Sequence, residues 1–304
     1  MSGLSSESVI LVTGASGFLG HFCLEQLIKS NCVIHAVNRH GDGPNSSRVW
    51  WHGLDLRDPD AASVLIRTVR PTHLLHVAWI ATPGRFWQDP DNLNWLKGGI
   101  SLLCAFGHYG GQRFVGVGSC AEYDWKQSRF VEDETPLLPN TLYGNVKVSM
   151  AFAAASVAMR YGFSAAWGRV FLPYGPSDTP GRLVPTVINS LVAGEPIELT
   201  MGTQERDFIF APDAANLLVT LLACDLNGFF NIGTGRGTTV RQVVESLADR
   251  LGGRELLKFG VLKNNEPPRL VADIQKVFGR LGWLAPTTLE KGLDMVIESA
   301  LGER

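Results

Sequence analysis

Short apolar runs alternate with longer segments of helical periodicity through the first half of the chain. The apolar runs predict strands at Val9–Thr13, Val33–Asn38, Thr72–Ala78, Arg113–Gly118 and Ser164–Phe171. The segments between them predict helices at Gly17–Ser30, Ala61–Val69, Asn92–Tyr109 and Leu142–Tyr161. Because strands and helices alternate, this half is expected to form a parallel sheet from βαβ units. The nearly continuous apolar character of VILVTG indicates a sheet with helices on both faces.

The pattern changes after Phe171, where several prolines interrupt the periodicity. Further helices are expected at Val184–Ala193, Ala211–Ala223, Val240–Leu251 and Ile274–Leu281. The sequence therefore predicts an α/β fold, a Rossmann-type doubly wound parallel sheet over residues 1–171. A smaller mixed α/β part is expected over residues 172–304, with some of its segments packing back on the first.

The composition is that of a soluble globular protein. The 304 residues are 45% hydrophobic and 18% charged, and 27 Lys+Arg face 29 Asp+Glu. This balance and the lack of a basic run argue against a nucleic-acid binder. No apolar stretch is long enough to span a membrane, and MSGLSSESVI lacks the features of a signal peptide, so a cytoplasmic location is expected. The five cysteines and seven histidines show no metal-ligand spacing, and no metal is expected.

A glycine-rich turn joins the first strand to the first helix. Gly14, Gly17 and Gly20 would allow the tight turn, the close approach of a pyrophosphate and close helix packing. The free N–H groups and the dipole at the helix N-terminus favour an anion there. A strand–helix turn without a ligand also uses glycines, but the strand–turn–helix context favours dinucleotide binding.

The end of the second strand bears on the choice of cofactor. NAD sites commonly place an acid here to bind the ribose, whereas this chain has Asn38 and Arg39. A guanidinium can hold a 2′-phosphate, so NADP(H) is favoured and NAD(H) is the alternative. Arg39 can equally be a solvated loop residue. Asp55 and Leu56 suit an adenine pocket, or are a turn acid and a core leucine.

Three residues suggest proton transfer at a hydroxyl or carbonyl oxygen. Tyr143 and Lys147 lie four apart in a helical segment, so both project from one face. A neighbouring ammonium lowers the pKa of a phenol, which otherwise ionises near pH 10. Ser119 follows the strand ending at Gly118, at the edge of the sheet where ligands bind in such folds, and its hydroxyl would contact the same oxygen.

With these residues in place, the chain resembles the extended short-chain dehydrogenases/reductases, specifically the nucleotide-sugar epimerase/dehydratase/reductase family. The likeness covers nearly the whole chain. It includes TGASGFLG, DLRD (Asp55–Asp58), HVAW (His76–Trp79), GSCAEY (Gly118–Tyr123), YGNVK, RVFLPYGP (Arg169–Pro176), RDFIFAPDAA (Arg206–Ala215), NIGTG (Asn231–Gly235) and LGW before Leu284.

The resemblance implies a catalytic triad of Ser119, Tyr143 and Lys147. It implies a dinucleotide site formed by Gly14, Ser16, Gly17, Phe18, Leu19, Gly20, Asn38, Arg39, Asp55, Leu56, Val77, Ala78, Trp79, Tyr143 and Lys147. It assigns a nucleotide-sugar substrate mainly to residues 172–304, with Arg206 on the diphosphate. Relatives also pair two long helices into a homodimer, which here would be Asn92–Tyr109 and Leu142–Tyr161, although internal packing explains their apolar content equally well.

Departures from the family pattern narrow the activity. Sugar 4,6-dehydratases carry an Asp-Glu pair after the catalytic Ser or Thr, whereas Cys120 and Ala121 stand here, which argues against dehydration. Cys120 is interpreted as a packing residue beside the substrate. Leu172 replaces a frequent diphosphate-binding Asn, and Lys263 lies near a second phosphate-binding Arg of some relatives. Arg182 or Arg269 would compensate.

An aromatic loop is expected over the cleft. Trp79, Pro83, Arg85, Phe86 and Trp87 follow the strand ending at Ala78, and Trp95 and Trp125 add further aromatic surface. These side chains either pack on a sugar or belong to the core.

The first hypothesis is an NADP-dependent 4-ketoreductase of a nucleotide-activated 4-keto-6-deoxy sugar. The alternatives are a nucleotide-sugar epimerase with tightly bound NAD and a non-catalytic dinucleotide sensor.

Overall fold

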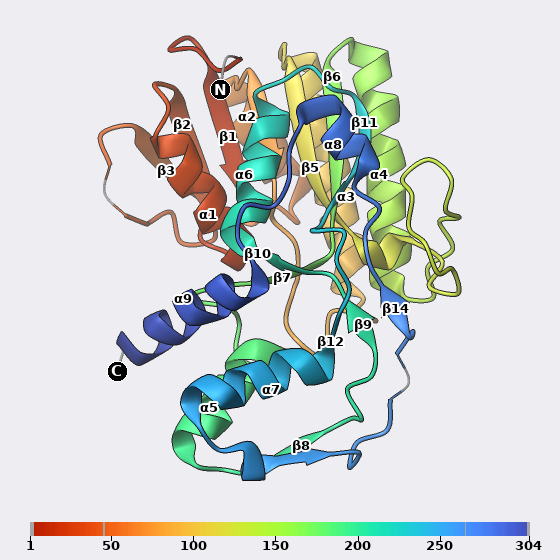
Figure 1. The fold of residues 1–304 in the computed structure, drawn as a ribbon. Helices are drawn as coiled ribbons and strands as arrows, with labels where there is room; N and C mark the ends of the chain where they lie inside the picture. Colours follow the sequence, from red (N-terminus) through yellow and green to blue (C-terminus); the bar gives the residue numbers. More distant parts are fainter. Residues whose placement is uncertain (1–2, 45, 265, 303–304) are drawn as a thin grey trace.

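The centre of the molecule is a seven-stranded parallel sheet (Figure 1). This computed structural model describes residues 3–44, 46–264 and 266–302. The strand order is β11-β6-β5-β4-β1-β2-β3. The strands are β1 (Val9–Thr13), β2 (Val33–Asn38), β3 (Val49–Gly53), β4 (His73–His76), β5 (Arg113–Ser119), β6 (Ser164–Val170) and β11 (Gly228–Ile232). The Rossmann-type doubly wound sheet predicted from the sequence is confirmed.

Helices cover both faces of this sheet, as the apolar strands predicted. On one face lie α1 (Phe18–Ile28), α6 (Ala211–Leu222) and α8 (Gln275–Leu281); on the other lie α2 (Pro59–Val69), α3 (Asp91–His108) and α4 (Leu142–Tyr161). Within β1, Ile10 and Val12 pack with the α1 and α6 layer, whereas Leu11 packs with the α2, α3 and α4 layer. Side chains that alternate along a strand therefore fill two separate cores.

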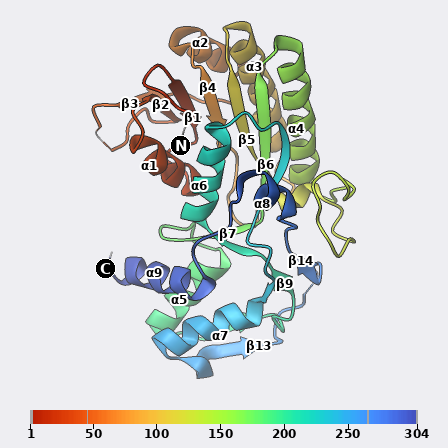
Figure 2. The same cartoon turned by 45° about the horizontal axis from the view of Figure 1, so that its top comes forward.

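The rest of the chain forms a smaller unit beyond the carboxyl ends of the sheet strands (Figure 2). Its core is built by α5 (Leu183–Ala193), α7 (Val240–Leu251) and α9 (Leu289–Gly302). The short strands here are β7 (Leu172–Tyr174), β8 (Ile197–Leu199), β9 (Glu205–Arg206), β10 (Phe208–Phe210), β12 (Thr238–Thr239), β13 (Leu257–Phe259) and β14 (Arg269–Leu270). They pair as β7 with β10, β8 with β13, and β9 with both β12 and β14.

Several elements differ from the sequence expectation. The two edge strands β3 and β11, the helix α9 and the individual short strands of the smaller unit were not predicted. An edge strand is covered on fewer sides, so its sequence need not be continuously apolar, and Trp50 of β3 is 48% exposed. Predicted strand Thr72–Ala78 also ends earlier, at His76, because residues 77–80 leave the ladder to begin the loop above the sheet.

A buried arginine joins the sheet to α6. Arg113, at the start of β5, donates through Nε and Nη2 to the Leu221 carbonyl, at 3.1 and 2.6 Å, and through Nη2 to the Leu226 carbonyl at 2.8 Å. The last carbonyls of a helix lack partners within the helix, and a cation there also complements the helix dipole. Arg113 thus closes the C-terminus of α6 against the sheet.

We expect Arg113→Leu to lower the free energy of unfolding by about 1–3 kcal/mol, because it removes the buried hydrogen bonds that the guanidinium donates to the Leu221 and Leu226 carbonyls. Urea unfolding followed by circular dichroism measures the change. Arg160→Leu, which removes an exposed arginine from the last turn of α4, is the matched control and should change stability by less than about 0.5 kcal/mol. Equal losses in both variants would contradict the role assigned to Arg113.

Candidate active site

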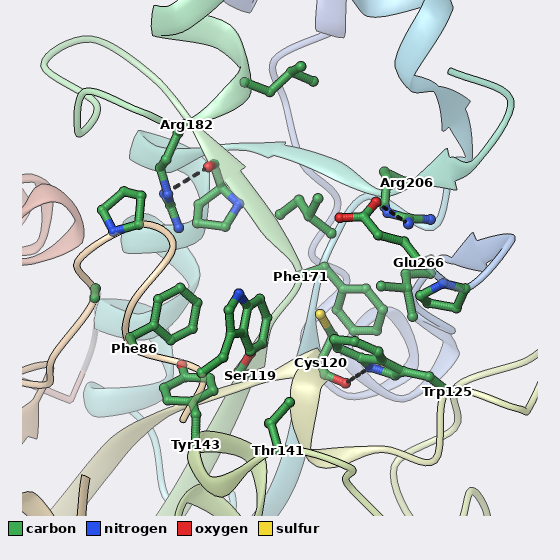
Figure 3. Close-up of a pocket in the computed structure, with 18 of the residues that line it drawn as sticks. Phe86, Ser119, Cys120, Trp125, Thr141, Tyr143, Phe171, Arg182, Arg206 and Glu266 are labelled. Atoms are coloured by element: carbon green, nitrogen blue, oxygen red, sulfur yellow. Dashed lines mark hydrogen bonds and ion pairs between the residues drawn. The ribbon is translucent and has the colours of Figure 1, made fainter. Parts of the chain in front are cut away.

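A cavity of about 860 Å³ lies between the sheet and the smaller unit. Ser119, Cys120 and Tyr143 line it from the sheet side, and Arg182 and Arg206 line it from the other part of the chain. In Figure 3 the two arginines lie across the cavity from Tyr143 and Thr141. A pocket of this size, with a few polar groups on a largely apolar lining, suits an organic ligand.

The three predicted catalytic residues come together where β5 ends and α4 begins. Ser119 is the last residue of β5. Thr141 caps α4 by accepting a hydrogen bond from the Gly144 N–H at 3.0 Å, which places Tyr143 in the first helical turn. The Tyr143 N–H donates to the Trp87 carbonyl at 3.0 Å. Lys147 lies one turn further along and donates from Nζ to the Val117 carbonyl at 2.8 Å.

Burial shifts the pKa values of Tyr143 and Lys147 in opposite directions. Desolvation raises the pKa of the Tyr143 phenol, and a hydrogen bond with Ser119 partly offsets that rise. Desolvation also lowers the pKa of Lys147 to about 7, against the attraction of the Glu122 carboxylate. Tyr143 is therefore a proton donor at neutral pH, and Lys147 loses its charge near neutrality.

The ammonium of Lys147 also contacts an aromatic face. Its Nζ lies 3.8 Å from the centroid of the Trp79 ring, a cation–π geometry. Trp79 stacks on Trp95 at 6.1 Å and donates from Nε1 to Asn92 at 2.9 Å. The Trp79 ring therefore packs against Lys147, and Trp79 is not among the residues that line the cavity.

Aromatic side chains form a wall beside the ring of Tyr143. Phe86 meets the Tyr143 ring edge-on at 4.8 Å, and Trp87 does so at 5.8 Å. Trp125 packs on Trp87 at 5.8 Å and donates from Nε1 to the Cys120 carbonyl at 3.0 Å. The structure brings Pro83, Phe86, Trp87 and Trp125 to the cavity.

The glycine-rich turn has the shape that a dinucleotide requires. Gly14 has φ +68°, and an added Cβ would lie 2.7 Å from Ala78 Cα. A Cβ on Gly20 would overlap the Gly14 carbonyl oxygen. Ser16 and Gly17 are exposed at the N-terminus of α1, and Phe18 and Leu19 begin the helix. The backbone therefore fits a pyrophosphate over the free N–H groups of α1.

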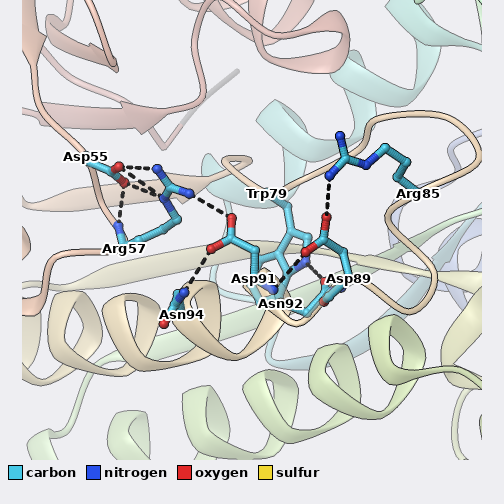
Figure 4. A network of polar contacts seen from close by, with 8 residues as sticks. All are labelled: Asp55, Arg57, Trp79, Arg85, Asp89, Asp91, Asn92 and Asn94. Atoms are coloured by element: carbon cyan, nitrogen blue, oxygen red, sulfur yellow. Dashed lines mark hydrogen bonds and ion pairs between the residues drawn. The ribbon is translucent and has the colours of Figure 1, made fainter.

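The residues predicted on the adenine side of the cofactor site form hydrogen bonds and ion pairs within the protein. Asn38 Oδ1 accepts from the His40 and Gly41 N–H groups, at 3.0 and 2.6 Å, which shapes the turn that leaves Arg39 exposed. Asp55 pairs with Arg57, which also donates to Asp91 at 2.8 Å (Figure 4). This pairing lowers the pKa of Asp55.

Leu56 is buried in the core beside this network. Val77 and Ala78 continue from β4, and their N–H groups donate to the carbonyl and the hydroxyl of Thr13, at 3.3 and 3.2 Å. These contacts hold the two segments next to the glycine-rich turn, where the sequence places the dinucleotide.

Two of the three candidate substrate arginines face the cavity. Arg206 is 3% exposed and donates from Nη2 to Glu266 at 2.8 Å. Arg182 donates from Nη1 to Asp178 at 3.2 Å and lies over the Phe18 ring at 5.5 Å. Arg269 instead pairs with Glu205 outside the cavity. Side chains alternate along a strand, so Leu270, and not its neighbour Arg269, faces the cavity.

The residues after Ser119 agree with a packing role. Cys120 lines the cavity, and burial raises the pKa of its thiol to about 12. The thiol is therefore neutral at physiological pH and a poor base. Ala121 is buried behind it, and Leu172 presents an apolar side chain to the cavity. Lys263 is exposed and lies outside the lining.

Sequence reasoning missed three carboxylates near this site. Asp178 and Glu266 hold the two cavity arginines, and Glu122 lies beneath Ser119. The pattern Ser-x-x-Glu at residues 119–122, directly after a strand, is the signature of a capping box and identifies Glu122. The other two lie in loops whose approach to the cavity only the tertiary structure determines.

Neither a metal centre nor a membrane segment was found in the part of the chain that the structure describes. Within residues 3–44, 46–264 and 266–302, no three His, Cys, Asp or Glu side chains are grouped closely enough to hold a metal ion. Across those same ranges, no helix combines the length and apolar character needed to cross a bilayer.

The doubly wound sheet, the glycine-rich turn and the Ser119–Tyr143–Lys147 group define a short-chain dehydrogenase/reductase of the extended type. A family model described as "NAD dependent epimerase/dehydratase family" matches residues 10–233. The chain belongs to this family, whose members act on nucleotide sugars.

Relatives with several activities match nearly the whole chain. A UDP-glucose 4-epimerase from Arabidopsis thaliana is 24% identical, over 93% of this chain and 92% of its own length. A dTDP-4-dehydro-6-deoxyglucose reductase from Escherichia coli is 22% identical, over 95% and 96%. The solved structure of MoeE5 in complex with UDP-glucuronic acid and NAD has a TM-score of 0.86 and 27% identity, covering 98% of this chain and 100% of that one. NAD is the cofactor named there, and no comparison supports a preference for NADP.

Two substitutions in the glycine-rich turn are expected to weaken dinucleotide binding to different degrees. We expect Gly20→Ala to raise the Kd for the dinucleotide at least about tenfold, because its Cβ would push the Gly14 carbonyl out of place. Gly17→Ala, whose Cβ would lie 3.2 Å from the same oxygen, should have a smaller effect. Isothermal titration with NADH and with NADPH measures both. The reverse order of effects would contradict this geometry.

Proposed function

We propose that this protein reduces the 4-keto group of a nucleotide-activated 4-keto-6-deoxy sugar. A bound reduced nicotinamide dinucleotide would supply hydride to the ketone carbon. Tyr143 donates its proton to the ketone oxygen, and Ser119 donates a hydrogen bond that orients the same oxygen. Lys147 stabilises the phenolate that Tyr143 becomes. Arg206 and Arg182 bind the diphosphate across the cavity.

The aromatic wall beside Tyr143 is the observation that carries this proposal. Phe86 and Trp87 contact the Tyr143 ring, Trp125 packs on Trp87, and Phe171 lines the same cavity. Aromatic faces bind the apolar side of a ring well but do not satisfy many hydroxyl groups. A deoxygenated sugar suits this lining better than a fully hydroxylated one. The match to an Escherichia coli dTDP-4-dehydro-6-deoxyglucose reductase supports the same substrate class.

Epimerisation is the second candidate function. Several relatives are named as 4-epimerases, and the Arabidopsis thaliana protein matches over most of the chain. In that reaction a bound NAD would take the hydride from carbon 4 while Tyr143 removes the proton of the 4-hydroxyl. The 4-keto sugar would then rotate in the cavity, and the reduced cofactor would return the hydride to its other face. A cavity of about 860 Å³ leaves room for that rotation.

The proposal for either function includes a homodimer through α3 and α4, which expose Leu93, Ile100, Phe152 and Met159.

We expect Tyr143→Phe to lower kcat by about 10²- to 10⁴-fold, because it removes the proton donor while keeping the ring and its packing. The assay follows the absorbance of NADPH or NADH against a panel of 4-keto-6-deoxy nucleotide sugars. Tyr109→Phe, at the end of α3, is the control and should keep wild-type turnover. Turnover by Tyr143→Phe within a few-fold of wild type would contradict the mechanism.

The cofactor separates the two candidate functions. Within the reductase proposal, Arg39 binds the 2′-phosphate of NADP(H), so Arg39→Ala should raise the Kd for NADPH about tenfold and leave that for NADH unchanged. Denaturing the purified wild-type protein and analysing the supernatant by chromatography provides the complementary measurement. Near-stoichiometric released NAD would favour the epimerase, because a cofactor that is recycled within each turnover need not exchange.

A further inference from the structure

One fully buried carboxylate lies directly beneath the catalytic group. Glu122 ends the 3-10 turn Cys120–Glu122 that follows Ser119, and it is 0% exposed. Its Oε1 accepts from the Ser119 N–H and from Trp167 Nε1, both at 2.9 Å. Its Oε2 accepts from Arg169 Nε at 2.7 Å. Three donors thus hold the carboxylate in one orientation.

The partner of this carboxylate is equally buried. Arg169 is 0% exposed and donates from Nη1 to the Tyr123 hydroxyl and to the Glu132 carbonyl, both at 3.1 Å. Its strand position is opposite Gly118, the residue before Ser119. The ion pair therefore spans the carboxyl ends of β5 and β6. Fixing Glu122 in this way also fixes the backbone of Ser119.

Glu122 is also the carboxylate that acts on the buried ammonium of Lys147. The groups around Lys147 are Tyr143 on its own helix, His76 on β4, the Trp79 and Trp167 rings, and Glu122 on the turn after β5. Burial lowers the pKa of His76 to about 3, so His76 is neutral and adds no charge. Glu122 opposes the loss of the Lys147 proton that burial favours. The same carboxylate accepts from Trp167, one of the rings facing Lys147.

We propose that Glu122 is a positioning residue of the reaction, which holds Ser119 in place and favours the charged form of Lys147. The inference rests on the proposed proton-transfer role of the triad, whichever sugar is the substrate. Without the carboxylate, Lys147 loses its proton at lower pH, and the phenolate of Tyr143 loses its stabilising cation.

The test uses Glu122→Gln, which keeps the shape of the side chain and removes its charge. The titration of Lys147 is followed in protein labelled with ¹³C-lysine, without substrate, through the Cε resonance that is missing in Lys147→Arg. The wild-type midpoint is expected near pH 7, and we expect the midpoint of Glu122→Gln about one pH unit lower. The alkaline limb of the kcat profile should move to lower pH by the same amount.

The matched control is Glu132→Gln. Glu132 is buried on the far side of Arg169, where its Oε1 accepts from the Asn231 N–H at 2.7 Å. Its substitution should leave the Lys147 midpoint unchanged. Glu122→Asp keeps the charge on a shorter side chain, so it should lower kcat through the misplaced Ser119 while the Lys147 midpoint stays near that of wild type. If Glu122→Gln does not fold, Glu122→Asp still tests whether Glu122 positions Ser119.

Two results would overturn the effect on Lys147. One is a Lys147 midpoint that does not move in Glu122→Gln, and the other is an equal shift in Glu132→Gln. For Glu122→Asp, wild-type kcat would overturn the positioning of Ser119. A shifted midpoint in an enzyme that turns over no 4-keto sugar would leave the inference standing and refute only the proposed substrate, because the titration requires no substrate.

Discussion

The buried pair of Glu122 and Arg169 is the constraint on which the rest of the site depends. Breaking such a pair by removing one partner typically costs about 3–5 kcal/mol, because the remaining charge is left without compensation. Here every donor to the carboxylate belongs to an element that forms the site: the Ser119 backbone, Trp167 and Arg169. Movement of the turn after β5 would therefore break several buried contacts at once, which gives the catalytic serine a fixed place.

The same burial that orders the site also sets its chemistry. Lys147 is buried and Tyr143 is partly buried, and this desolvation raises the pKa of the phenol and lowers that of the amine. Alone, these shifts would leave two neutral groups. The carboxylate of Glu122 and the ring of Trp79 favour the ammonium of Lys147, and the hydroxyl of Ser119 favours the phenolate of Tyr143. Proton transfer at neutral pH thus depends on a few polar contacts inside an otherwise aromatic wall.

Local sequence signals were sufficient for much of the fold and for the juxtaposition of Ser119, Tyr143 and Lys147. The expected bounds of β1, β2, α4 and α7 match the structure, because apolar periodicity and capping residues such as Thr141 act within a few residues of each other. Edge strand β3 escaped prediction because its apolar signal is weak where one side of the strand is open. Asp55 and Arg269 carried signals that suited a ligand, yet each pairs with a neighbouring side chain of opposite charge.

By itself the sequence determined the doubly wound sheet, the glycine-rich turn and the spacing that aligns Ser119, Tyr143 and Lys147. These follow from periodicity, backbone conformation and helical geometry, which are properties of short segments. The tertiary structure alone decided which arginines face the cavity, which aromatic rings enclose Tyr143, and that Glu122 meets Arg169 across two strands. Those contacts join residues tens to more than a hundred positions apart, and their energies depend on burial, which no local pattern specifies.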